Sequence, residues 1–152
     1  MNPAVFERGA VRALMSLPGA VLDKLSAGLE THSRSHLDSR LRFLLALSAA
    51  KPTLDSGTVE QARRLYRDVI NLLDVAPVSL PVVGDHQVPR DDGSSMRVRR
   101  YRPALAPRVA PAILFMHGGG FTVGGVDEYD RLCRYIADRT NAVVLSVDYR
   151  LS

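Results

Sequence analysis

The residues best suited to chemistry lie in one glycine-rich segment, residues 113–125. Four apolar residues are followed by His117, three consecutive glycines at 118–120 and Phe121. Three glycines in a row cost conformational entropy, and they serve a purpose where the backbone must turn sharply or approach a ligand closely. Main-chain N–H groups in such a turn can hold an oxygen that becomes negatively charged during acyl transfer. The segment therefore predicts a strand that leads into a loop of backbone hydrogen-bond donors.

Two phosphate-binding motifs also place glycines between a strand and a helix, and both fail on specific residues. A dinucleotide-binding fingerprint that starts at Gly118 requires glycine at position 123, which is Val123. A P-loop that uses Gly119 and Gly124 requires lysine at position 125, which is Gly125. A purely structural loop stays open as the alternative to acyl-transfer chemistry.

A second motif, Asp-Tyr-Arg-Leu at 148–151, follows the His-Gly-Gly-Gly segment in the chain. With these two motifs in this order, the chain resembles the hormone-sensitive-lipase-like carboxylesterases and lipases, a branch of the α/β-hydrolases. The resemblance implies hydrolysis of a small-molecule carboxylic ester through an acyl-enzyme, with no cofactor and no metal. It assigns the oxyanion-hole N–H groups to Gly119 and Gly120, and it gives His117 and Gly118 the role of shaping the turn.

Two side chains beside the glycines have competing interpretations. His117 could act as a general base, but the base of this family comes late in the chain, so we expect His117 to brace the loop instead. Phe121 is expected either to border the substrate pocket or to belong to the core, and both interpretations stay open. In the second motif, Asp148 and Arg150 are assigned to structural hydrogen bonds and ion pairs.

The nucleophile of such an enzyme lies in a Gly-x-Ser-x-Gly sequence, which these 152 residues do not contain. Ser95 follows Gly93 at the right spacing, but position 97 is Arg97. The resemblance therefore corresponds to the N-terminal portion of a family member, and we expect residues 1–152 alone to be inactive. A complementary C-terminal half is the partner that this hypothesis implies. The alternative is a non-catalytic binding or interaction module on a hydrolase scaffold.

The elements that must position these residues fall into two parts, a helical cap segment at 1–76 and a partial catalytic domain at 77–152. The first part contains four predicted helices: Pro3–Met15, Pro18–Leu29, residues 36–49 and a helix that starts at Thr58. The second part contains strands 1–4 of a hydrolase sheet: an antiparallel hairpin of residues 78–88 and 95–102 around Asp91-Asp92-Gly93, and buried strands at 112–116 and 142–147 joined by a helix at 127–139. The predicted fold class is thus α/β.

Periodicity also predicts which side chains face inward. The inward sets are Leu37, Leu41, Leu44, Leu45 and Leu47 in one helix, Ala62, Leu65, Tyr66, Val69, Leu72 and Leu73 in the next, and Tyr129, Leu132, Cys133 and Ile136 in the last. Asp127 is the predicted N-cap of that last helix. Buried in this face, Cys133 is expected to be inert. Without a fifth strand, residues 112–116 are expected to form a bare hydrophobic edge.

Composition limits the remaining function classes. The chain carries a net charge of +4 and its pI is near 9.6, but no aromatic platform accompanies the arginines, so nucleic-acid binding is not indicated. The arginines at 97, 99, 100 and 102 are expected to form a solvated sheet edge. His32 and His36 lack the further ligands of a zinc site. The single cysteine and the lack of a long apolar run predict a soluble, cytoplasmic chain with no membrane span.

Overall fold

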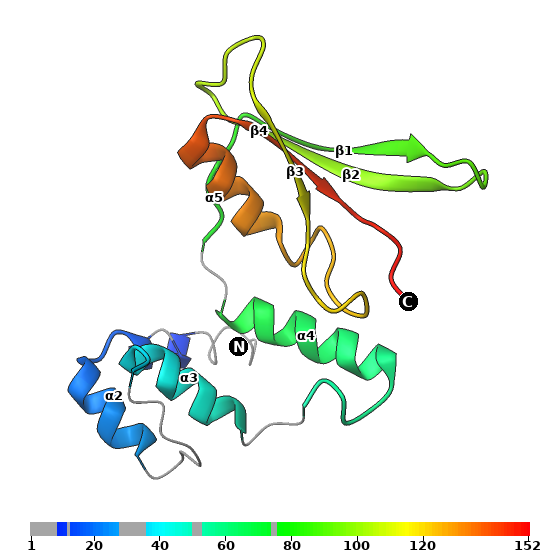
Figure 1. Cartoon of the computed structure of the whole chain (residues 1–152). Helices are drawn as coiled ribbons and strands as arrows, with labels where there is room; N and C mark the ends of the chain where they lie inside the picture. Colours follow the sequence, from blue (N-terminus) through cyan, green and yellow to red (C-terminus); the bar gives the residue numbers. More distant parts are fainter. Residues whose placement is uncertain (1–8, 12, 28–35, 50–52, 74–75) are drawn as a thin grey trace. The chain divides into compact units, whose positions relative to one another are not determined.

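The computed structural model describes residues 9–11, 13–27, 36–49, 53–73 and 76–152. These residues cluster into two compact units, Met1–Gly57 and Thr58–Ser152 (Figure 1). The assignment of residues 1–76 to a cap and 77–152 to a catalytic domain stays a prediction.

The first unit contains helix α2 (Gly19–Ser26) and helix α3 (Ser39–Ala49). The two helices are joined by an ion pair between Asp23 and Arg42. The buried side chains of α3 include Phe43 and Ala46, whereas Leu41 is 46% exposed. The predicted inward position of Leu41 was therefore wrong, because a helix with leucines on several sides does not fix which side is buried.

Several predictions for this first part fall wholly or partly on undescribed residues. Residues 9–11 and 13–15 are helical, but the beginning of the predicted helix at 3–15 lies outside the described residues. The same holds for the end of the helix predicted at 18–29, for His32 and for the side chain of Leu47. His36 is exposed, as expected for a surface residue.

The second unit starts with helix α4 (Val59–Leu73), whose first turn is capped reciprocally. The Thr58 N–H donates to Oε1 of Gln61 at 2.8 Å, and the Gln61 N–H donates to Oγ1 of Thr58 at 3.3 Å. This arrangement is a capping box, which satisfies two otherwise unpaired main-chain donors. Ala62 is buried and the rest of the predicted inward face up to Leu72 is half-buried, so the prediction is confirmed for these residues; the side chain of Leu73 lies outside the described part of the chain.

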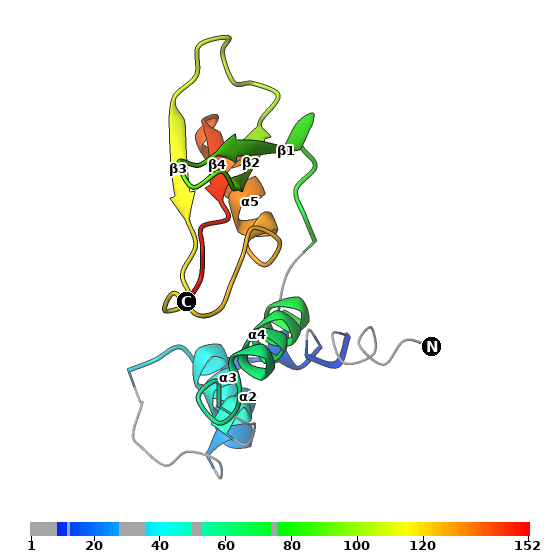
Figure 2. The same cartoon turned by 90° about the vertical axis from the view of Figure 1, so that its right-hand side faces the viewer.

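Four strands form one mixed sheet in the order β1-β2-β4-β3. They are β1 (Val82–Pro89), β2 (Ser95–Arg102), β3 (Ala112–Met116) and β4 (Val143–Val147). β2 pairs antiparallel with β1 on one side and with β4 on the other. β3 and β4 are parallel, as expected for the connection through a helix. Figures 1 and 2 show this sheet with helix α5 along one face. The structure confirms the predicted hairpin, the two further strands and the α/β fold class, but only β4 is buried, because β3 lies at the edge of the sheet and none of its residues is fully buried.

Helix α5 (Asp130–Thr140) begins three residues later than predicted. Residues 126–129 form turns, and Tyr129 occupies the N-cap position without a side-chain capping bond. Asp127 is therefore not the N-cap; its carboxylate pairs with arginines of β2 instead. Leu132, which was predicted to face inward, is 45% exposed, because the buried face of α5 runs through Cys133 and Ala137 and Leu132 lies at its margin.

The core of the second unit lies between α5 and one face of the sheet. Its fully buried members are Tyr101, Cys133, Ala137 and Val144. Each strand contributes alternate residues to this face, as the pleat requires. β3 lies at the end of the strand order, and its Leu114 and Met116 side chains are 62% and 67% exposed. Residues 112–116 thus form an edge strand with an apolar, exposed face, as predicted.

The arginines of β2 contradict the sequence-based expectation of a solvated edge. β2 lies between β1 and β4, so it is an inner strand. Arg99 is paired with Asp85 at 2.6 Å and with Asp130 at 3.3 Å, and its side chain is only 17% exposed. The arginines and aspartates of this face therefore connect the hairpin to α5 and to the turn before it. Among the described residues, no helix is long and apolar enough to cross a membrane.

Candidate functional site

The glycine loop leaves the carboxyl end of β3 and turns sharply at once. Gly119, Gly120 and Phe121 have φ values of +133°, +57° and +59°, and Gly124 has +94°. The N–H groups of Thr122 and Val123 both donate to the carbonyl of Gly119, each at 3.0 Å. Positive φ is unfavourable for residues with a Cβ atom, so this turn needs glycine at most of these positions.

The glycines of the loop differ in how much room a Cβ atom would have. A Cβ atom on Gly119 would lie 1.9 Å from the carbonyl oxygen of Val123, and one on Gly124 would lie 2.7 Å from Nδ1 of His117. A Cβ atom on Gly120 would meet nothing within 4 Å. Gly119 and Gly124 are therefore required by close packing, whereas Gly120 is required only by its backbone conformation and borders open space.

That open space is a cavity of about 440 Å³. It is lined by Met116, His117, Gly118, Gly119, Gly120, Phe121 and Tyr149. None of the hydrogen bonds between described residues uses the amide of Gly119 or Gly120 as its donor. A main-chain N–H without a protein acceptor binds water or a ligand oxygen. Gly119 and Gly120, whose amides have no acceptor among the described residues, thus line an accessible and largely apolar cavity.

The His117 side chain packs against the glycine loop. It is 3% exposed, and its ring stacks on Tyr149 with a centroid distance of 4.3 Å and on Tyr129 at 5.6 Å. Nδ1 lies 2.9 Å from the carbonyl oxygen of Gly118, which can only accept, so the proton belongs on Nδ1. The hydroxyl of Tyr149 donates to the carbonyl oxygen of His117. Buried and held by these contacts, His117 has the geometry expected of a brace.

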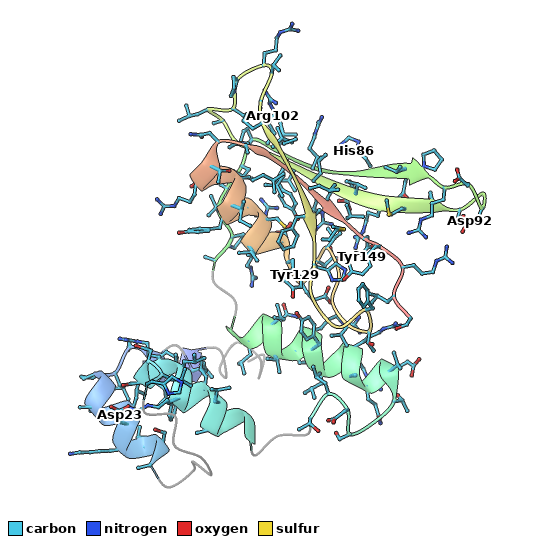
Figure 3. All side chains as sticks on the ribbon, viewed as in Figure 1. Asp23, His86, Asp92, Arg102, Tyr129 and Tyr149 are labelled. Atoms are coloured by element: carbon cyan, nitrogen blue, oxygen red, sulfur yellow. The ribbon has the colours of Figure 1, made fainter. Side chains whose placement is uncertain are left out.

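Three tyrosines around His117 were not identified as site residues from the sequence. Tyr66 on α4 and Tyr129 before α5 have their hydroxyl oxygens 2.8 Å apart, and burial raises the pKa of Tyr66. The Tyr129 hydroxyl also lies against Gly118, where a Cβ atom would approach it to 3.3 Å. Figure 3 shows Tyr129 and Tyr149 near the glycine loop. Tyr66 and Tyr129 were predicted only as inward-facing, and helical periodicity does not reveal which polar group such a tyrosine contacts.

Phe121 does not belong to the core. Its side chain is 72% exposed, and its ring meets Tyr149 edge-on at 6.2 Å. The carbonyl oxygen of Phe121 accepts hydrogen bonds from both the N–H and the Oγ of Ser152, each at 2.9 Å. The interpretation of Phe121 as a core residue was therefore wrong, and its place in the cavity lining agrees with the pocket interpretation.

The charged residues of the second motif form ion pairs, as expected. Asp148 pairs with Arg97 at 3.0 Å, and Arg150 pairs with Asp92 at 2.8 Å. Cys133 is fully buried, and burial raises the pKa of its thiol to about 11, so it is no candidate nucleophile. No group of three metal-binding side chains occurs within the part of the chain that the structure describes.

Comparison with known proteins relates this geometry to a family. The family model for the alpha/beta hydrolase fold matches residues 113–152, which include the glycine loop. Carboxylesterase NlhH of Mycobacterium tuberculosis is 34% identical over 124 residues, which are 80% of this chain and 37% of that protein. Ethyl acetate hydrolase of Pseudomonas putida is 34% identical over 61% of this chain and 30% of its own length.

Solved structures agree with these sequence matches. An esterase of Pyrobaculum calidifontis superposes with a TM-score of 0.61 at 34% identity, over 71% of this chain and 34% of that structure. An ester hydrolase from the metagenome of Lake Arreo gives 0.64 at 26% identity, over 89% of this chain and 38% of that structure. This chain belongs to the α/β-hydrolases. It spans about a third of the length of the α/β-hydrolase relatives that it matches.

Proposed function

We propose that this α/β-hydrolase segment supplies the oxyanion-binding part of a carboxylic-ester hydrolase, with the amides of Gly119 and Gly120 as donors. The observation that carries the proposal is the pair of N–H groups beside the cavity, which have no acceptor among the described residues. Attack on an ester carbonyl converts its oxygen into an anion. Fixed donors about 3 Å from that anion stabilise it by roughly 3–4 kcal/mol each.

The surrounding residues have supporting roles in this proposal. His117 and Gly118 hold the turn, because the Nδ1 bond to the Gly118 carbonyl and the tyrosine stacking fix the peptide that precedes the donors. Phe121 and Met116 border the substrate. No charged side chain lines the described part of the cavity, so we infer that an uncharged ester of small size binds there.

The nucleophile, the acid and the base would come from a complementary C-terminal portion. Such a portion would also cover β3, whose exposed Leu114 and Met116 stabilise the sheet only when they are buried. The third donor of the oxyanion site would be the N–H after the nucleophilic serine. We expect residues 1–152 alone to hydrolyse p-nitrophenyl esters at the rate of an unrelated protein, and saturable turnover would contradict this expectation.

A pair of glycine variants tests the donor assignment in a chimera that joins residues 1–152 to the C-terminal portion of the mycobacterial carboxylesterase. Gly120 and Gly93 both have positive φ, and a Cβ atom on either meets nothing within 4 Å. Leucine costs about 1–2 kcal/mol of backbone strain at each position. Only at Gly120 would it fill the place of the substrate oxygen.

We expect Gly120→Leu to lower kcat at least about 100-fold, the loss typical of losing one oxyanion hydrogen bond, because the leucine side chain would keep the substrate oxygen away from the donors. Gly93→Leu, in the turn between β1 and β2, should leave kcat within about twofold of the parent. Equal kcat values for the two variants would overturn the assignment. Circular dichroism and a urea midpoint within the range of the Gly93→Leu variant would show that the Gly120→Leu chimera is folded.

A second candidate function, a non-catalytic interaction module, draws on a different observation. Leu114 and Met116 expose more than three-fifths of their surface on an edge strand, where a partner could dock. Light scattering after size exclusion of residues 1–152 separates the two hypotheses. A stable monomer would count against any need for a completing partner, and a defined complex that lacks esterase activity would favour the interaction module.

A further inference from the structure

Arg63, on helix α4, donates hydrogen bonds to two main-chain oxygens, one in the glycine loop and one after the Asp-Tyr-Arg-Leu motif. Its Nε donates to the carbonyl oxygen of Thr122 at 2.9 Å, and its Nη2 donates to the main-chain oxygen of Ser152 at 2.9 Å. Thr122 belongs to the glycine loop, and Ser152 follows the Asp-Tyr-Arg-Leu motif. One planar guanidinium therefore connects three segments that are separated by 59 and 89 positions in the chain.

The two segments are also bonded to each other. The N–H and the Oγ of Ser152 both donate to the carbonyl oxygen of Phe121. Phe121 has a φ of +59°, a conformation that is strained for a residue with a side chain. The surrounding structure must hold such a residue in place. Arg63 and Ser152 supply three hydrogen bonds to two successive carbonyls at this strained position, directly after the donor Gly120.

We propose that Arg63 is a positioning residue that fixes the glycine loop in its donor conformation from helix α4. A guanidinium suits this task because its donors lie in a rigid fork, so one side chain can hold two oxygens at a set separation. Arg63 does not line the cavity at Gly120; it borders a separate hollow of about 450 Å³ with Arg67 and Asp148. It would thus act on the donors only through the backbone of the loop.

The inference rests on the proposed function for its catalytic consequence, but its main test needs no catalysis. In the uniformly ¹⁵N-labelled chain, NMR measures the order of the Gly119 and Gly120 amides and the exchange of the Thr122 and Val123 amides. Rigid backbone gives order parameters near about 0.85, and flexible backbone gives values below about 0.6. The variant Arg63→Met keeps the aliphatic stem and removes the donors, and Arg64→Met is the matched control because Arg64 is exposed on the same helix.

We expect Arg63→Met to lower the order parameters of Gly119 and Gly120 toward the flexible range and to speed exchange of Thr122 and Val123 at least about tenfold. Arg64→Met should change neither, and Gly84 in β1 should stay rigid in both. Arg63→Lys should restore only part of the protection, because one ammonium group is not a fork. Ser152→Ala, which loses only the Oγ bond, should give a smaller change in the same amides.

Three results would overturn the proposal. They are an unchanged loop in Arg63→Met, full protection in Arg63→Lys, and a loss of order at Gly84 as large as that in the loop. In the chimera, Arg63→Met should lower kcat about tenfold and leave KM nearly unchanged, because a loosened donor loop mainly weakens the transition state. An ordered loop held by Arg63, together with equal kcat values for Gly120→Leu and Gly93→Leu, would instead reject the oxyanion role alone.

Discussion

The two faces of the sheet differ in how completely this chain covers them. On one face, α5 buries Tyr101 and Val144 fully, and arginines and aspartates link the strands to the helix. On the other face, Leu114 and Met116 of β3 are largely exposed. Hydrophobic stabilisation scales with the apolar area removed from water, so the α5 face provides most of the stability of the second unit. The same face is buried at Val98 and Val147, but its β3 part, with Leu114 and Met116, contributes to stability only once something covers it.

The largest effect should come from placing a charge in the α5 face. Val144 on β4 is fully buried, so Val144→Lys puts an ammonium group among Tyr101, Cys133 and Ala137. An unpaired charge in a core lowers the free energy of unfolding by about 4 kcal/mol or more. We expect this variant to lose its cooperative urea transition, monitored by circular dichroism. A transition close to that of the parent would mean that the α5 face is not the main core.

The strands of the face that α5 covers were predicted from the sequence more completely than the ion pairs on that face. Alternation and the turn residues at 91–93 located the hairpin and the strands β3 and β4, because these signals are local. The helix stripe misplaced Leu132, which lies at the margin of the buried face, and the N-cap was misplaced at Asp127, since the start of α5 depends on the turns before it. The pairing of Arg99 with Asp85 and Asp130 could not be predicted, because it depends on which strands become neighbours.

The candidate site likewise contains a part that the sequence predicted and a part that it did not predict. The residue types at 117–121 predicted a donor loop, and the conformations of Gly119 and Gly120 agree with it. Arg63 gave no signal in the sequence, because its bonds to Thr122 and Ser152 form only after three distant segments meet. Side-chain contacts with main-chain oxygens leave no residue pattern, since every residue carries such an oxygen.

A smaller effect should follow from removing one hydroxyl on the α5 face. The Tyr101 hydroxyl donates to Oδ1 of Asp130 at 3.0 Å, and Asp130 keeps its bonds to Arg99 and Arg134 when that donor is lost. Tyr101→Phe should therefore lower the free energy of unfolding by about 1–2 kcal/mol. Tyr135→Phe is the control, because Tyr135 is 51% exposed and should change stability by less than about 0.5 kcal/mol. Equal urea midpoints for the two variants would contradict this interpretation of the network.

Acid should weaken the ion pair between Arg99 and Asp85 on the same face and thereby lower the stability of the fold. The hydrogen bond from Arg99 holds the pKa of Asp85 below its usual value. Because the folded-state pKa is lower than the unfolded value of about 3.9, the pair stabilises the fold above that pH and stops doing so as pH falls through the folded pKa. Asp85→Asn should therefore lower the urea midpoint at pH 7, and its effect should shrink as the pH falls through the folded-state pKa of Asp85. The effect should be small, since the carboxylate is 36% exposed. A midpoint difference that persists at low pH would exclude the charge as its cause.

The smallest change in stability should come from placing the same charge on the face with Leu114 and Met116. Leu114 is 62% exposed, so Leu114→Lys removes little buried surface, and we expect the free energy of unfolding to stay within about 0.5 kcal/mol of the parent. Lysine on an edge strand opposes pairing between chains, so light scattering should show less self-association of Leu114→Lys at high protein concentration. Arg100→Lys, on the exposed part of β2, keeps its charge and should not change the association. A large loss of stability in Leu114→Lys would mean that Leu114 is covered in solution, and the difference between the two faces would then arise from an intermolecular contact of this strand.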